Sequence, residues 1–183
     1  MEKRTLNGLN LTDEDYIFAG NLTIDGDVVI KNGHLVVSGH LEIINAKQIS
    51  IDGDISAGSL TIGSFDCNLA VIYGDIFVAQ HFYISHVDLK CNNINILGNS
   101  NMGGNIHCLN FLINGDNESF EIEAEEDIYI MGSNYSASLI GRDIFINGDC
   151  NFNDYTSKVS RDAYIGGKII SGFINCSSLN VGN

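Results

Sequence analysis

The sequence contains no proline and no tryptophan. Proline removes a backbone N–H donor, so its absence from all 183 residues favours a structure in which nearly every backbone donor is paired. No stretch approaches the ~18 consecutive apolar residues of a membrane-spanning helix, and the N-terminus lacks the apolar run of a signal peptide. We therefore expect a cytoplasmic protein that does not bind a membrane.

Basic residues are scarce, since nine Lys and Arg stand against 23 Asp and Glu and the formal net charge is −14. Such a chain repels nucleic-acid backbones, so we expect no direct binding to nucleic acid. It attracts basic protein surfaces, and many of these bind nucleic acid. An acidic surface also keeps a protein soluble, which is the simpler interpretation.

Sequence motifs for chemistry are absent as well. No CxxC pair occurs among the five cysteines, which favours buried reduced thiols over a zinc or redox site: Cys67, Cys91, Cys108, Cys150 and Cys176. The histidines fall in no recognisable catalytic motif: His34, His40, His81, His86 and His107. We therefore predict no catalytic residues, no bound metal and no cofactor.

The abundant residues are isoleucine, asparagine and glycine, with 26, 22 and 20 copies. β-Branched side chains suit pleated, half-buried surfaces. Asparagine and glycine tolerate the left-handed backbone conformations of tight corners. Together they predict many short strands joined by sharp turns.

A short unit recurs in which alternating apolar residues flank a glycine and a polar residue. Residues 22–30 (LTIDGDVVI) and 35–43 (LVVSGHLEI) are two copies. Each alternation of period two predicts a short strand with one buried face, and each glycine step predicts a corner. Five later segments end in glycines that lie 17, 17, 16 and 19 residues apart: residues 93–98, 110–115, 127–132, 143–148 and 162–167.

Three sides of about six or seven residues make one coil of this length. The sequence therefore predicts an all-β, single-domain parallel β-helix (β-solenoid) of about eight coils of roughly 16–21 residues. An antiparallel sandwich would lack the glycine column. A left-handed hexapeptide helix keeps a strict six-residue step, so the drifting coil length favours a right-handed helix. Residues 1–19 do not fit the repeat and are expected to cap a solenoid over 20–183, whose C-terminal edge is expected to be bare.

The aligned segments predict which side chains face inward and which face outward. Two inward columns are Ile94, Phe111, Ile128, Ile144, Ala163 and Ile96, Ile113, Ile130, Ile146, Ile165. The outward positions predict an exposed row of Leu112, Tyr129, Phe145 and Tyr164. Such a row suits a protein partner, a second copy or a sugar chain, and aromatic ladders also stabilise a coil without binding anything.

Charged residues gather in the same half of the chain. Alternation within 118–127 places Glu121, Glu123 and Glu125 toward solvent, where rows of carboxylates can imitate the phosphates of a duplex. A solvated acidic face is the simpler interpretation. Arg142–Asp143 and Arg161–Asp162 are expected to stack as weak corner ion pairs, and they neutralise a carboxylate column that could otherwise attract calcium: Asp127, Asp143 and Asp162.

Residues 49–63 (ISIDGDISAGSLTIG) and 71–79 (VIYGDIFVA) resemble the core of a bactofilin. The resemblance extends as a pattern over roughly 20–172. Bactofilins are right-handed β-helices that polymerise end to end into bacterial cytoskeletal filaments without nucleotide. The resemblance implies a self-assembling structural scaffold.

The function we expect is that of a non-enzymatic structural or interaction protein that assembles with itself or binds a protein partner, through the solenoid ends or the aromatic row. An alternative is an acidic inhibitor that mimics nucleic acid and blocks a basic site on a DNA- or RNA-binding enzyme. A weaker alternative is a β-helix carbohydrate binder or lyase.

Overall fold

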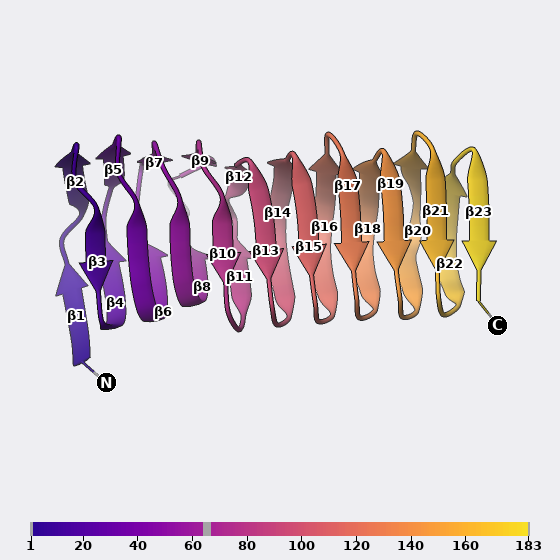
Figure 1. The fold of residues 1–183 in the computed structure, drawn as a ribbon, viewed down its shortest axis with the longest axis horizontal. Helices are drawn as coiled ribbons and strands as arrows, with labels where there is room; N and C mark the ends of the chain where they lie inside the picture. The colour runs from indigo at the N-terminus through magenta and orange to yellow at the C-terminus, as the bar shows by residue number, and fades with distance from the viewer. Residues whose placement is uncertain (1, 64–66, 183) are drawn as a thin grey trace.

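Every strand of the computed structural model pairs in parallel with its neighbours, and together the strands wind into one β-solenoid (Figure 1). The structure describes residues 2–63 and 67–182, and these contain no helix. From the N-terminus, strands nearest the viewer run downward and those behind run upward as the chain advances to the right. This winding is right-handed. The predicted fold is confirmed, although the solenoid has about ten turns rather than eight.

Each turn has three sides, and strands on the same side stack into three sheets, which we call faces one, two and three. Strands confined to face one are β1 (Glu2–Leu6), β4 (Gly20–Asp25) and β11 (Phe82–Ser85). Face two contains β2 (Leu9–Thr12), β5 (Val28–Lys31), β7 (Ile49–Ile51), β9 (Leu69–Ile72) and β12 (Asp88–Lys90). Face three contains β3 (Tyr16–Phe18), β10 (Ile76–Val78), β13 (Asn93–Ile96), β15 (Asn110–Ile113), β17 (Asp127–Ile130), β19 (Asp143–Ile146), β21 (Asp162–Ile165) and β23 (Ser178–Val181).

The longer strands bend across a corner and serve two faces. In the first half, β6 (Leu35–Ile44) and β8 (Ile55–Gly63) run from face three to face one. In the second half, five strands run from face one to face two: β14 (Ser100–Cys108), β16 (Asn117–Ala124), β18 (Asn134–Gly141), β20 (Cys150–Val159) and β22 (Ile169–Asn175). Glycine allows these bends, because a Cβ on Gly104 would collide with the carbonyl oxygen of Val87 in the coil below.

Coil length varies as the glycine spacing predicts. On face three the step between paired residues ranges from 16, between Ile128 and Ile144, to 21, between Ile55 and Ile76. Face one has one longer step of 22 residues, between Leu60 and Phe82. Most extra residues lengthen a corner, whereas between β20 and β22 the register also shifts within face one, after Cys150.

The core lies inside the tube of strands, and both predicted inward columns are confirmed. Their members pair in register from coil to coil on face three. All ten are buried, and Ile130 is 0% exposed. Each apolar side chain therefore packs mainly against the same position one coil above and below, which is the arrangement expected for a solenoid.

A buried polar ladder interrupts this apolar core on face one, and the sequence interpretation missed it. The inward column there is apolar from Leu22 to Phe82 but continues with Ser100, Asn117 and Asn134. The Asn117 amide donates to Asn134 Oδ1 at 2.7 Å, and Ser100 Oγ lies 2.7 Å from Asn117 Oδ1. These residues are at most 4% exposed, so their mutual hydrogen bonds are what make their burial tolerable.

The segment expected as an N-terminal cap lies at the end of the tube, where it forms a first coil. Its strands β1, β2 and β3 pair in register with β4, β5 and β6. Arg4 occupies the core column of Leu22, and its guanidinium carbon lies 5.5 Å from the centroid of the Phe18 ring. Arg4 Nη1 also donates to the Tyr16 hydroxyl at 3.3 Å. A cation over an aromatic ring therefore covers part of this end.

Candidate interaction surfaces

The row of Leu112, Tyr129, Phe145 and Tyr164 lies on face three, where each residue pairs with the next one along the solenoid. Tyr129 and Tyr164 are 42% and 39% exposed. The Phe145 and Tyr164 rings stack with centroids 4.8 Å apart, and those of Tyr129 and Phe145 lie 6.3 Å apart. The row thus stabilises its own coils and still presents aromatic area to solvent.

The three glutamates of the acidic run do not form adjacent rows of carboxylates. Glu121 and Glu123 lie on β16, and Glu125 follows at the corner. On the preceding coil, Glu121 pairs with Asn105 and Glu123 pairs with His107. The His107 Nδ1 lies 3.1 Å from Glu123 Oε2. On the next coil the paired residues are Ser138 and Ile140. A continuous double row like that of duplex phosphates is therefore not formed by these residues.

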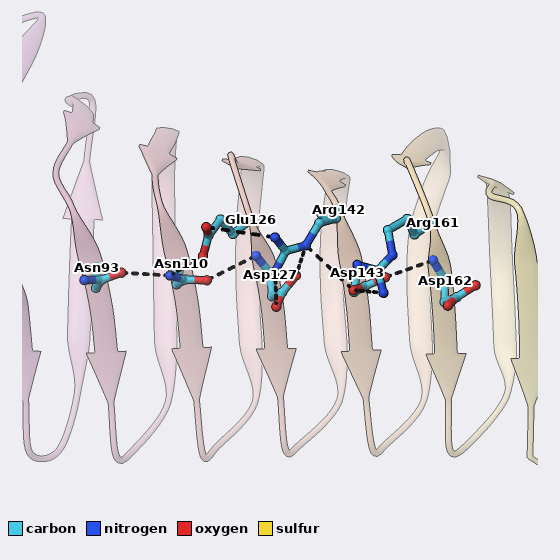
Figure 2. A network of polar contacts seen from close by, with 8 residues as sticks. All are labelled: Asn93, Asn110, Glu126, Asp127, Arg142, Asp143, Arg161 and Asp162. Atoms are coloured by element: carbon cyan, nitrogen blue, oxygen red, sulfur yellow. Dashed lines mark hydrogen bonds and ion pairs between the residues drawn. The ribbon is translucent and has the colours of Figure 1, made fainter.

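The carboxylate column at Asp127 belongs to a longer polar ladder along the edge between faces two and three (Figure 2). Its members precede the first inward residue of face three on nine successive coils: Asp15, His34, Asp54, Asp75, Asn93, Asn110, Asp127, Asp143 and Asp162. Most accept a hydrogen bond from the backbone N–H of the next member, as Asp54 does from Asp75 at 2.8 Å. The ladder satisfies backbone donors at the corner, which is a structural role.

The two arginines of this edge contact different partners from those expected. Arg142 makes its two shortest contacts with Asp127 of the preceding coil, at 2.9 and 3.1 Å, and lies 3.8 Å from Asp143 (Figure 2). Arg161 reaches back to Asp143 at 3.4 Å and not to Asp162. The hydrogen bond with Asp127 raises the pKa of Arg142, so this cation stays charged. Across 2–63 and 67–182, no three His, Cys, Asp or Glu side chains converge as a metal site requires.

The two ends of the tube differ in chemistry. At the first coil, Leu9 and Phe18 are 9% and 7% exposed, and the Arg4 guanidinium lies over the Phe18 ring. At the tenth coil, Leu179 and Val181 occupy the core columns of Ala163 and Ile165 but are 46% and 39% exposed. The last described coil therefore presents an apolar edge.

Comparison with protein-family models, with curated proteins and with solved structures finds no match to this chain. Its function is therefore inferred from the solenoid and its surfaces. Among the residues that the structure describes, no helix is long and apolar enough to cross a bilayer.

The cysteines are spread through the tube. Cys67, Cys91, Cys108 and Cys150 are buried, and Cys176 is half-buried. Burial raises the pKa of Cys108 and Cys150 to about 12, which suppresses the thiolate form that reacts with electrophiles.

A hollow on face one was not predicted from the sequence. Tyr83 and Tyr135 stand at its two ends, and Asn101 and Glu118 lie between them on the two intervening coils. The hollow has a volume of about 400 Å³. No local motif marks it, because its residues come from four different coils and meet only through the register of face one.

Proposed function

We propose that this protein is a structural scaffold that assembles end to end, with the tenth coil of one copy stacked on the first coil of the next. The observation that carries the proposal is the exposure of core columns at the tenth coil. Ile174, Leu179 and Val181 continue columns that are apolar throughout most of the tube.

The first coil offers matching positions for these side chains. The column of Ile174 begins at Leu9, that of Leu179 begins at Tyr16, and that of Val181 begins at Phe18. A second copy placed one coil further along would therefore set apolar side chains on apolar side chains in three columns. The column of Ile169 would meet Arg4, whose aliphatic stem can cover an apolar neighbour while its charge reaches solvent.

Backbone pairing favours the same geometry. Each inner strand has a parallel partner on both sides, whereas β1, β2 and β3 at one end and β22 and β23 at the other have one partner coil. Open strand edges are templates for pairing with another chain. A tenth coil meets a first coil with parallel strands, so the ladder of the tube continues unchanged across the junction.

The distribution of charge favours a junction of a tenth coil with a first coil over a junction between two first coils. Asp13, Glu14 and Asp15 lie at the corner between faces two and three of the first coil, so two first coils would bring like charges together. Residues 166–182 contain one charged side chain, Lys168, and no carboxylate. Stacking a first coil on a tenth coil therefore avoids the repulsion. The resemblance to bactofilins implies assembly end to end, and the polarity of the junction is inferred from the charges and the columns alone.

Light scattering across protein concentration and salt, with negative-stain images of the same samples, tests the proposal. We expect growth with concentration that persists at high salt, because the contact is apolar. Val181→Lys should abolish growth, since it places a charge in the junction. The matched control is Asn180→Lys on the same strand, where the side chain points away from the core and growth should continue.

Mixing the variant with the wild type tests the polarity of the junction. Val181→Lys keeps an intact first coil, so it should bind the tenth coil of a wild-type filament and stop further growth there. Substoichiometric variant should therefore shorten the filaments. Wild-type protein that is monomeric at every concentration would refute end-to-end assembly, and filaments of unchanged length in the mixture would refute this polarity.

A further inference from the structure

The hollow on face one has a composition that the end-to-end contact does not explain. Tyr83, Asn101, Glu118 and Tyr135 occupy the same outward position on four successive coils, on strands β11, β14, β16 and β18. The tyrosines are 44% and 43% exposed, so each ring presents a large part of its surface to solvent. The shorter side chains between them leave a trough of about 400 Å³.

Polar side chains line the trough between the two tyrosines and along the neighbouring corner. The Asn101 amide donates to Glu118 Oε2 at 3.0 Å, which holds both side chains in place. The neighbouring corner adds His81, Asn99 and Asp116. Asn99 Oδ1 accepts from the Asp116 backbone N–H at 2.9 Å, which positions its amide. The trough thus combines two aromatic walls with planar hydrogen-bonding groups between them.

We propose that this trough binds a neutral oligosaccharide that lies along the solenoid axis, with a sugar ring against each tyrosine. A sugar ring has an apolar C–H face that suits an aromatic ring and a hydroxyl edge that suits amides and carboxylates. Tyrosine supplies apolar area with a polar tip. Three coil steps separate the two rings by about 14 Å, so the trough suits a short chain of sugars rather than a single one.

Other ligand classes fit this trough less well. The net charge of −14, with Asp116 and Glu118 in the trough itself, disfavours nucleic acids and anionic glycans. A peptide that binds by strand addition needs an open strand edge, but β14 and β16 already pair with coils on both sides. The oligosaccharide site does not depend on the end-to-end assembly, because these strands lie in the middle of the tube (Figure 1).

Isothermal titration calorimetry with maltohexaose, cellohexaose and chitohexaose tests the proposal, with a heparin-derived hexasaccharide as the anionic comparison. A glycan array of neutral and anionic oligosaccharides extends the search beyond these probes. We expect at least one neutral oligosaccharide to bind, and Tyr83→Ala and Tyr135→Ala each to weaken it roughly tenfold. Tyr83→Phe and Tyr135→Phe should retain most of the affinity, because they keep the rings.

The matched control is Tyr129→Ala, which removes a tyrosine of nearly equal exposure, 42%, from face three. It should leave the affinity unchanged. Thermal unfolding of every variant checks that the fold is intact. The proposal is overturned if no neutral glycan binds, if anionic glycans bind more tightly, or if Tyr129→Ala weakens binding as much as the two trough substitutions do.

Discussion

Replacing Asn134 by leucine tests whether the buried polar ladder holds the second half of the tube together. Asn134 Oδ1 accepts from Asn117, and its amide donates to Ser136 Oγ, both at 2.7 Å. Leucine fits the column, since Leu22, Leu41 and Leu60 occupy it in the first half. It cannot accept from Asn117, however, whose buried amide keeps only its 3.0 Å bond to Ser119.

The expected cost follows from what is left unpaired. A net hydrogen bond contributes about 1 kcal/mol, and a buried donor without a partner costs about 1–3 kcal/mol. We therefore expect Asn134→Leu to lower the free energy of unfolding by ~2–4 kcal/mol, which is a large part of typical domain stability. The measurement is urea and thermal unfolding followed by circular dichroism. Asn101→Ala on the exposed side of the same face is the matched control and should cost less than about 0.5 kcal/mol.

The double variant Asn117→Leu/Asn134→Leu separates hydrogen bonding from packing. Replacing both partners removes the unpaired amide, so the double variant should be more stable than the sum of the two single variants predicts. Ser100 loses its partner in this variant, so the recovery is expected to be partial. Additive losses, or a single Asn134→Leu variant as stable as the wild type, would refute the reasoning.

Two further predictions concern the corner ion pairs and the thiols. Arg142→Met should lower the melting temperature more than Arg161→Met, because Arg142 makes two close contacts with Asp127 whereas Arg161 makes one longer contact with Asp143. Melting curves at low and high salt check this, since screening should shrink both effects; equal losses would contradict it. In native protein at pH 8, iodoacetamide should label Cys176 alone, with the buried thiols reacting only after unfolding, because burial suppresses their thiolate form. Mass spectrometry identifies the labelled residues, and rapid native labelling of Cys108 would contradict this prediction.

The end-to-end contact and the face-one trough have different consequences for the assembled protein. If copies stack as proposed, each one contributes a trough to the side of the filament. Repeated weak sites on one rigid rod bind a long polymer far more tightly than a single site does. A scaffold of this kind would present a regular array of sites at the spacing of one copy.

Local patterns in the amino-acid sequence were enough to identify the fold class and the core of face three. A strand with one buried face alternates every two residues, and a corner at a close backbone approach requires glycine. Both signals are local, so the columns of Ile128 and Ile130 and the coil lengths on face three are read without any knowledge of distant contacts. The outward row from Leu112 to Tyr164 follows from the same alternation.

The number of coils, the buried ladder and the trough depend on how successive coils stack, so they could not be read from local sequence patterns. Arg4 stands at a core column, so the first coil does not show the apolar alternation of the repeat. Asn117 and Asn134 look like surface residues, and their burial is stable only because each is stacked on the other. Tyr83 and Tyr135 share one outward row of face one. The corners between them vary in length, so their spacing in the sequence does not reveal that they align. Alternation is a property of one strand, whereas stacking is a property of successive coils, and only the folded tube brings those coils together.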